Sequence, residues 1–256
     1  DNKFGTVGVP LYTTEYERMV VEITTFRTEK GFSDNRRPDK VEWGKSIEED
    51  LARRDFTINA IALKLTTSDQ RPTTNIIDPY EGQKDIQNKI IKAVGDPKKR
   101  FKEDALRLLR AIRIATEHSF TIEENTWKEI VSDALIIKEV SGERIRIELL
   151  RILASDHAYA GIMLLKDSNL LNYILPELIE GIGVSQKRPG RHHTDDVFTH
   201  NVLSLKLCPA KNPIVRFAAL LHDVGKPQVM SKDKEDLVIF HNHEVAGAKI
   251  AAEICE

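Results

Sequence analysis

The chain has 256 residues, of which 41% are hydrophobic and 30% charged, and its formal net charge is −2. This composition is typical of a globular protein with one to three domains, and it excludes a collagen-like or wholly disordered chain. The two cysteines, Cys208 and Cys255, form no Cys-x-x-Cys motif, which disfavours a zinc ribbon and fits a reducing, cytoplasmic location. No apolar run approaches the roughly 20 residues of a membrane span, so we expect no membrane partner.

The first part of the chain has the pattern of β-strands. Residues 4–12 and 19–26 are rich in β-branched side chains, and the polar stretch 13–17 between them predicts a hairpin turn. Residues 61–65 predict one more strand, and residues 66–74 predict a loop. We expect these strands to form a partial mixed β-sheet.

Helices are predicted from their N-terminal caps. Ser46 and Thr121 each have a glutamate three residues later, as in a capping box, and Ser141 precedes a third helical stretch. Asp96 followed by Pro97 predicts a further helix. Its expected apolar face consists of Phe101, Ala105, Leu108 and Ile112.

The remainder of the chain also reads as helical. Residues 159–180 predict further short helices, 181–193 contain glycine and proline and predict a linker, and the sequence from about Asp195 is helical again. We therefore predict an α+β fold, with the strands first and the helices after them.

Basic residues are concentrated in one segment of this near-neutral chain. Residues 84–113 contain 10 basic and 4 acidic residues, a net charge of +6. Such a segment can hold an RNA backbone or a triphosphate, although a solvated helix face has the same composition. The candidate RNA-binding residues are Lys98, Lys99, Arg100 and Arg113.

The segment Arg53–Ala60, of sequence RRDFTINA, is a candidate nucleotide site. Arg53 and Arg54 can form charge-assisted bonds with triphosphate oxygens. Asp55 can accept hydrogen bonds from a ribose, and Asn59 can bond a sugar or a base edge. The alternative is an ordinary basic surface at a helix end.

The motif Glu103-Asp104-x-x-Arg107, with Arg110 after it, is a candidate base-reading site. Residues three apart on a helix are neighbours, so Asp104 and Arg107 are expected to present an acceptor beside a donor. Cytosine and adenine offer an amine beside an acceptor and match this pair, whereas uracil and guanine do not. The alternative is an intrahelical salt bridge.

Four segments together carry a family resemblance. Residues 53–63, 76–97, 100–115 and 142–153 occur in an order and spacing that resemble the bacterial-type (class II) tRNA nucleotidyltransferases, which comprise CCA-adding enzymes and poly(A) polymerases. The resemblance implies three regions: the C-terminal part of a nucleotidyltransferase head (1–80), a helical neck that selects nucleotides and binds RNA (81–182), and the start of a further helical domain (183–256).

The resemblance also implies roles for single residues. Glu22 corresponds to a catalytic, metal-binding carboxylate, residues 78–85 to a hinge, and Glu143 and Arg144 to a brace for the neck. The nucleotide-binding residues that it implies are Arg53, Arg54, Asp55, Asn59, Glu103, Asp104, Arg107 and Arg110.

The implied reaction is the transfer of CMP and AMP from CTP and ATP to the 3′ end of tRNA, with Mg²⁺ in the head. The sequences EDALR and TINAIAL are closer to CCA-adding enzymes, while poly(A), CC-only and A-only addition stay open. The family's Gly-Gly loop and Asp-x-Asp metal pair do not occur in these 256 residues. We therefore expect the chain as given to incorporate no nucleotide.

Histidines cluster near the end of the chain, where six of the eight lie between 192 and 243. His222-Asp223, with His200 before it and His243 after it, resembles an HD domain, a metal-dependent phosphohydrolase fold. The implied ligands are His200, His222, Asp223 and His243, for Mg²⁺ or a divalent transition metal. Two alternatives to nucleotidyl transfer therefore stay open: an HD phosphohydrolase and a catalytically silent RNA-binding protein.

Overall fold

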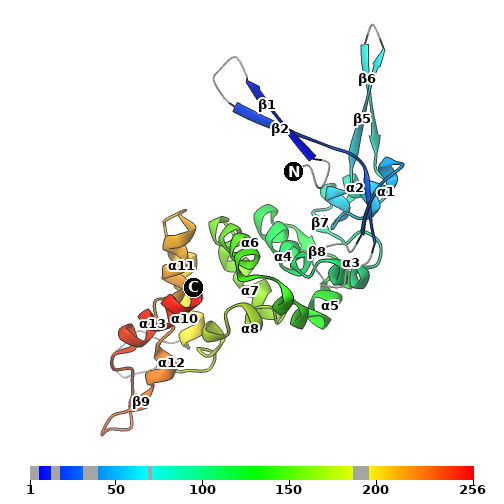
Figure 1. Ribbon diagram of the computed structural model, residues 1–256. Coiled ribbons are helices and arrows are strands. Elements are labelled where there is room, and N and C mark those ends of the chain that lie inside the picture. The colour runs from blue at the N-terminus through cyan, green and yellow to red at the C-terminus, as the bar shows by residue number, and fades with distance from the viewer. Residues whose placement is uncertain (1–5, 13–17, 31–39, 69–70, 187–195) are drawn as a thin grey trace. The chain divides into compact units, whose positions relative to one another are not determined.

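The computed structural model describes residues 6–12, 18–30, 40–68, 71–186 and 196–256. The chain divides into two compact units, residues 1–104 and 105–256 (Figure 1). The division falls inside the Glu103–Arg107 motif. Our three-part division at 80/81 and 182/183 stays a prediction.

The first unit combines short helices with two-stranded ribbons. Its strands are β1 (Thr6–Tyr12), β2 (Arg18–Thr24), β3 (Arg27–Lys30), β4 (Lys40–Trp43), β5 (Ala62–Ser68), β6 (Arg71–Ile77) and β7 (Ile90–Ile91). Three antiparallel pairs form: β1 with β2, β3 with β4, and β5 with β6 (Figure 1).

These pairs confirm the predicted strands but correct two expectations. The described strands of this unit do not join into a mixed sheet, because β1–β2, β3–β4 and β5–β6 are separate two-stranded ribbons. The predicted loop over 66–74 is mostly strand, and Thr66 pairs with Thr73. Threonine favours extended backbone, and this preference outweighs the polar composition of the stretch. The predicted turn at 13–17 lies outside the described residues.

Hydrogen-bonded side-chain caps start α1 and α3, two of the helices of the first unit. These helices are α1 (Ile47–Ala52), the 3₁₀ helix η2 (Thr57–Asn59), α2 (Gly82–Gln87) and α3 (Pro97–Glu103). The Ser46 hydroxyl accepts from the Glu49 amide at 3.4 Å, and the Asp96 carboxylate accepts from the Lys98 amide at 3.0 Å. Both predicted caps are thereby confirmed. A small core of Leu51, Ala60 and Val94 packs beneath α1.

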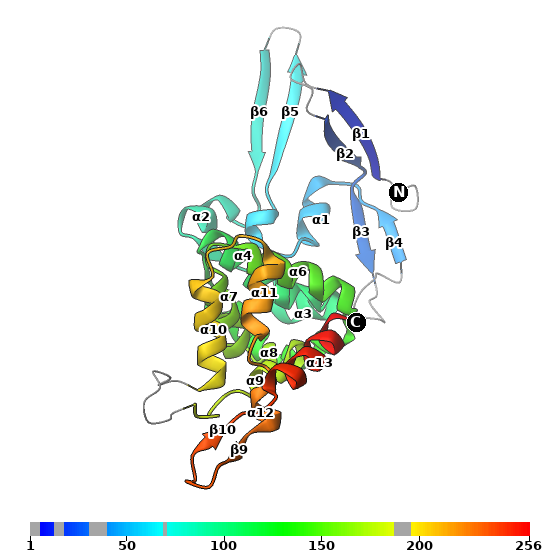
Figure 2. The same cartoon turned by 90° about the vertical axis from the view of Figure 1, so that its left-hand side faces the viewer.

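The second unit is mainly helical (Figure 2). Its helices are α4 (Leu106–His118), α5 (Glu124–Ser132), η3 (Ala134–Glu139), α6 (Gly142–Ala154), α7 (Ala158–Asp167), α8 (Leu171–Ile174), α9 (Pro176–Ile179), α10 (Val197–Leu207), α11 (Pro213–Leu221), α12 (Lys226–Val229) and α13 (His243–Cys255). Its strands are β8 (Thr121–Ile122), β9 (Ser231–Lys232) and β10 (Val238–Ile239). Helix α4 packs against α6 and α7, and α10 packs against α7 and α11.

Two helix boundaries differ from the sequence-based expectation. The single helix expected after Pro97 is divided, because Asp104 has extended backbone (φ −151°, ψ 106°) between α3 and α4. Helix α5 begins at Glu124 and not at Thr121, since the Glu123 carboxylate caps it by accepting from the Thr126 amide at 2.8 Å. Thr121 lies instead in the short strand β8.

A buried arginine fixes α11 to the end of α6. The Nη1 atom of Arg216 donates to the carbonyl oxygens of Leu153 and Ser155 at 2.8 and 2.5 Å. Its Nε atom donates to the carbonyl of Ala210 at 2.7 Å. These bonds use backbone acceptors left open where helix and loop end, so α11, which His222 follows, is held against the end of α6. Within the described ranges, no helix is long and apolar enough to cross a membrane.

Candidate nucleotide-binding and metal sites

A buried aspartate organises the two arginines of the RRDFTINA segment. The Asp50 carboxylate accepts from Arg53 Nη2 at 2.5 Å and from Arg54 Nη2 at 2.8 Å. Burial would raise the pKa of Asp50, but these hydrogen bonds hold it below its ordinary value. Among the described residues the buried Arg54 Nε atom has no hydrogen-bond partner, which makes it a candidate donor to a bound ligand. Sequence reasoning missed Asp50, although its spacing from both arginines places the three on one side of α1.

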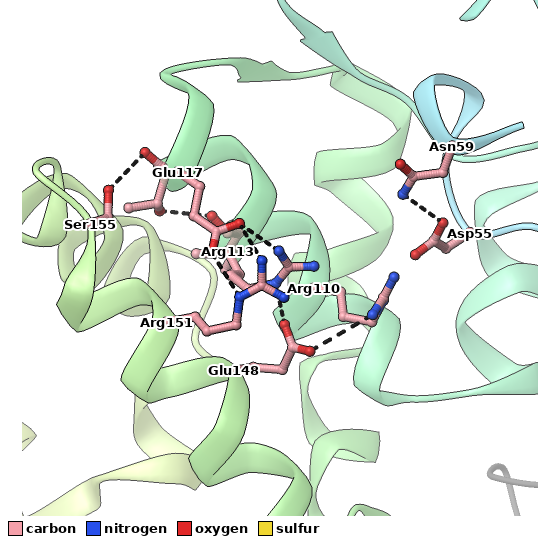
Figure 3. Close-up of polar contacts among 10 residues, drawn as sticks. Asp55, Asn59, Arg110, Arg113, Glu117, Glu148, Arg151 and Ser155 are labelled. Atoms are coloured by element: carbon pink, nitrogen blue, oxygen red, sulfur yellow. Dashed lines mark hydrogen bonds and ion pairs between the residues drawn. The ribbon is translucent and has the colours of Figure 1, made fainter. Parts of the chain in front are cut away.

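The next residues of this segment hold its turn together. Asp55 Oδ1 accepts from the Asn59 side-chain amide at 3.0 Å and from the Phe56 amide at 2.9 Å (Figure 3). Thr57 Oγ1 donates to Asp85 Oδ2 at 2.6 Å, and both of these residues are buried. Asp55 and Asn59, predicted to bind a nucleotide, therefore lie together at one turn.

Helix α3 presents only part of the predicted RNA-binding set. Lys98 and Lys99 are exposed. Arg100 is half-buried, and its guanidinium donates to the Ala52 carbonyl at 3.0 Å and to Glu103 Oε1 at 2.6 Å. Arg100 therefore links α3 to the end of α1, and its predicted contact with RNA stays a prediction.

The base-reading motif does not have the expected helical geometry. Asp104 ends α3 in extended backbone, and Arg107 lies in the first turn of α4. The two side chains therefore do not share the surface of one helix. Both are half-buried. Their joint role in reading a base stays a prediction.

Helices α4 and α6 share a network of arginines and carboxylates (Figure 3). Glu148 accepts a hydrogen bond from Arg113 Nε, and its other oxygen lies 3.8 Å from Arg110 Nη1. Glu117 accepts from Arg113 Nη1 at 2.5 Å and from Arg151 Nε at 2.9 Å. Arg113 is 5% exposed and serves this network, while its predicted contact with RNA stays a prediction. Glu148, which was not predicted from the sequence, links α6 to α4, while the bracing role implied for Glu143 and Arg144 stays a prediction.

Two histidines and an aspartate gather between α10 and the end of α11. His200 Nε2 and His222 Nε2 lie 3.1 Å apart and 3.4 and 3.2 Å from Asp223 Oδ2. Their ligand atoms all lie within 4.8 Å of one another. The carbonyl of Ala219 lies 2.9 Å from His222 Nδ1 and can accept its proton, which orients the ring so that Nε2 faces His200 and Asp223.

The surroundings of Asp223 keep it ionised. Burial would raise its pKa, but hydrogen bonds from His222 and Lys226 hold the pKa well below its ordinary value. Lys226 Nζ lies 2.5 Å from Asp223 Oδ2 and also bonds the side chain of Gln186. His243 Nε2 lies 3.5 Å from Asp223 Oδ1, beside the three-residue group and not within it.

Three family models match successive regions of the chain. Residues 1–92 match the poly A polymerase head domain, residues 119–181 the probable RNA and SrmB-binding site of polymerase A, and residues 198–256 the HD domain. The CCA-adding enzyme of Pediococcus pentosaceus is 37% identical over 225 residues, which cover 84% of this chain and 55% of that protein. The chain belongs to the family of CCA-adding tRNA nucleotidyltransferases and poly(A) polymerases.

Other members of this nucleotidyltransferase family give the same relationship. The CCA-adding enzyme of Limosilactobacillus reuteri is 46% identical over 158 residues, 62% of this chain and 36% of that protein. The crystal structure of Bacillus stearothermophilus CCA-adding enzyme in complex with CTP has a TM-score of 0.58 and 27% identity, covering all of this chain and 54% of its own. The chain thus spans about a third to a half of the length of these relatives.

Glu22 is the metal ligand that the resemblance implies for the first unit. It lies on β2 opposite Gly8 of β1 and is exposed. In the part of the chain that the structure describes, the only group of at least three side chains able to hold a metal is His200, His222 and Asp223. Glu22 as a metal ligand therefore stays a prediction.

Proposed function

We propose that this protein acts in adding CMP and AMP, from CTP and ATP, to the 3′ end of tRNA without a nucleic-acid template. The observation that carries this proposal is the similarity to curated CCA-adding enzymes, which extends over 84% of the chain at 37% identity. Poly(A) polymerase is the alternative within the family. The curated relatives compared above are CCA-adding enzymes, and we therefore favour CCA addition.

The residues of the first unit suit the triphosphate end of a nucleotide. Arg53 and Arg54 are oriented by one buried carboxylate, so little side-chain freedom is lost when they bind phosphate oxygens. The unpartnered Nε of Arg54 offers a further donor. Asp55 and Asn59, at the adjoining turn, supply an acceptor and an amide for the sugar.

The base is selected, in this proposal, by Asp104 and Arg107. A carboxylate accepts from the amine of cytosine or adenine, and a guanidinium donates to the neighbouring ring nitrogen. Uracil and guanine present a carbonyl to the carboxylate, which leaves two acceptors facing each other. The network around Glu148 steadies α4, which carries Arg107 and Arg110.

The family chemistry uses Mg²⁺, which would steady the charge that develops on the phosphates during transfer. Among the described residues of the head, Glu22 supplies a single exposed carboxylate, which alone does not make a magnesium site. We therefore derive no step through this ion and assign Glu22 only as a candidate ligand. Because the proposed substrate is tRNA, we also propose that the protein works in the cytoplasm.

Equilibrium binding of the four ribonucleoside triphosphates tests this function. The protein is titrated with each triphosphate, and CTP and ATP are expected to bind at least ten-fold more tightly than UTP and GTP, as one mismatched hydrogen-bonding group predicts. Equal affinity for all four triphosphates would contradict the proposal.

A second candidate function belongs to the histidine cluster alone. His200, His222 and Asp223 supply two imidazoles and a carboxylate, a set that suits a divalent transition metal or Mg²⁺. A bound ion would polarise a phosphoester and activate water for its hydrolysis. Metal-dependent release of phosphate from a phosphoester, lost in Asp223→Ala, would support this candidate. Its persistence in that variant would refute it.

A further inference from the structure

A small cavity lies between α7 and α10, and its lining includes none of His200, His222 and Asp223. Its volume is about 180 Å³. Tyr159, Met163 and Lys166 contribute to its lining from α7, where their spacing places them on one helix face. Phe198 and Val202 line it from α10, and Asp196 lies at its edge.

Lysines cover two aromatic rings beside this cavity. Lys166 Nζ lies 5.9 Å from the centre of the Phe198 ring, and Lys206 Nζ lies 4.9 Å from the centre of the Tyr159 ring. Phe198 is buried, whereas Tyr159 is partly exposed. Tyr159 is therefore the ring that an incoming planar group can reach, and each of the two rings has a lysine ammonium group within about 6 Å of its centre.

The polar edge of the cavity is preorganised. Asp196 Oδ1 accepts from the Thr199 amide at 2.7 Å, and Oδ2 accepts from the Gly183 amide at 2.8 Å. Each carboxylate oxygen still has a lone pair for a further donor. An apolar floor, an accessible aromatic face, flanking cations and a fixed acceptor are the features with which proteins bind an unstacked base of single-stranded nucleic acid.

We propose that this cavity binds one unstacked nucleobase of a bound RNA. The base stacks on Tyr159, Lys166 and Lys206 hold the phosphates that flank it, and Asp196 accepts from a base amine. The family model of an RNA-binding region covers residues 119–181 and so includes the three α7 residues of the cavity. The inference rests on the proposed function, because it assumes an RNA substrate, but it concerns a contact remote in sequence from the base-reading motif.

A matched pair of tyrosine variants tests the proposal on the full chain. Tyr159→Leu removes the stacking ring, and Tyr173→Leu removes a comparable ring, which lies under Lys138 at 5.0 Å and outside the cavity. The probe is a fluorescein-labelled single-stranded RNA with the sequence of a tRNA acceptor end. A second probe carries abasic positions in place of its bases. Binding is followed by anisotropy at fixed salt.

We expect Tyr159→Leu to weaken binding of the normal RNA roughly ten-fold, as loss of one base–aromatic stack does. Tyr159→Phe and Tyr173→Leu should bind it like the wild type. The abasic RNA should bind wild type and Tyr159→Leu equally, because it offers nothing to stack. Wild-type affinity of Tyr159→Leu for the normal RNA would overturn the proposal and leave the cavity to a protein partner or to solvent.

If Tyr159→Leu does not fold, Lys166→Gln combined with Lys206→Gln replaces it, with Lys138→Gln as the control. The double variant should show a shallower dependence of RNA affinity on salt than the control, because two phosphate contacts are lost. An equal salt dependence would overturn the proposal.

Titration of the same variants with CTP and UTP separates the proposal for the cavity from the proposed function. If the protein prefers CTP to UTP but Tyr159→Leu binds RNA like the wild type, only the proposal for the cavity is refuted. If the protein binds CTP and UTP equally but Tyr159→Leu weakens RNA binding, only the proposed function is refuted.

Discussion

Glu148 of α6 accepts a hydrogen bond from Arg113 of α4, and both side chains are buried (Figure 3). Taking two charges out of water is costly, so the intact pair adds little net stability. Loss of one partner is strongly destabilising, because it leaves the other charge buried and uncompensated. The pair joins α4 to α6, each of which is 13 residues long. Arg110, one turn before Arg113, reaches toward the same carboxylate.

Removal of one charge of this pair should therefore lower the free energy of unfolding. Glu148→Gln leaves the buried Arg113 with Glu117 as its remaining ionic partner, and we expect a loss of about 2 kcal/mol in the free energy of unfolding. Glu143→Gln, on the exposed side of the same helix, should stay within about 0.5 kcal/mol of wild type. Urea unfolding of both variants measures the difference, and equal stabilities would contradict a structural role for the pair.

Gly82 should not accept a side chain. A Cβ atom at this position would lie 2.2 Å from the Thr57 carbonyl oxygen, which is backbone and cannot move away freely. We expect Gly82→Ala to cost about 1 to 3 kcal/mol through overpacking. Gly142→Ala is the control, because no atom lies within 4 Å of its added Cβ. In thermal unfolding, the midpoint temperature should be lower than that of the wild type for Gly82→Ala and not for Gly142→Ala.

Stability should fall in acid. The pKa values of Asp50, Asp78 and Asp196 are below their ordinary values, because hydrogen bonds to each carboxylate outweigh the effect of burial. When folding lowers the pKa of a carboxylate, that group stabilises the folded state. This stabilisation is fully present above the pKa of the unfolded chain, about 3.9, and is lost as the pH falls through the pKa of the folded state. Unfolding free energies measured from neutral pH downward should therefore decline below about pH 4. Asp50→Asn should decline less steeply, and an unchanged slope would contradict this assignment.

The histidine cluster should bind a divalent metal through the three-residue group. Calorimetric titration of the protein with Mn²⁺ should give saturable binding that His222→Gln abolishes, because each ligand supplies one of the few bonds to the ion. His241→Gln is the matched control, since His241 is exposed and lies outside the group. Identical titrations for the two variants would show that His222 is not a ligand.

Local sequence signals predicted the elements that are built from local contacts. Ser46 and Asp96 cap their helices as expected, because a cap depends only on residues a few positions away. Thr121 failed as a cap because Glu123 offers a competing acceptor two residues later. The break at Asp104 was not predicted, since the apolar positions from Phe101 to Ile112 keep a helical spacing across it.

For the candidate site residues too, the sequence predicts contacts between near neighbours better than contacts between distant residues. Charge and motif pointed to Arg53 and Arg54, and their partner Asp50 lies only three and four residues away. The burial of Arg113 depends on Glu148, 35 residues away, and no local pattern reveals such a pairing. Asp50 and Lys226 lie within four residues of their partners, so spacing from the predicted site residues was the signal that could have found them.

Selection of the base by Asp104 is the step on which the proposed addition of CMP and AMP depends. The measurement is the ratio of the dissociation constants for UTP and CTP, in wild type, in Asp104→Ala and in the control Lys102→Ala, which changes an exposed side chain of α3. We predict a ratio of roughly ten or more in wild type and the control, and a ratio near unity in Asp104→Ala. A ratio near unity in wild type, or one that survives in Asp104→Ala, would contradict the account.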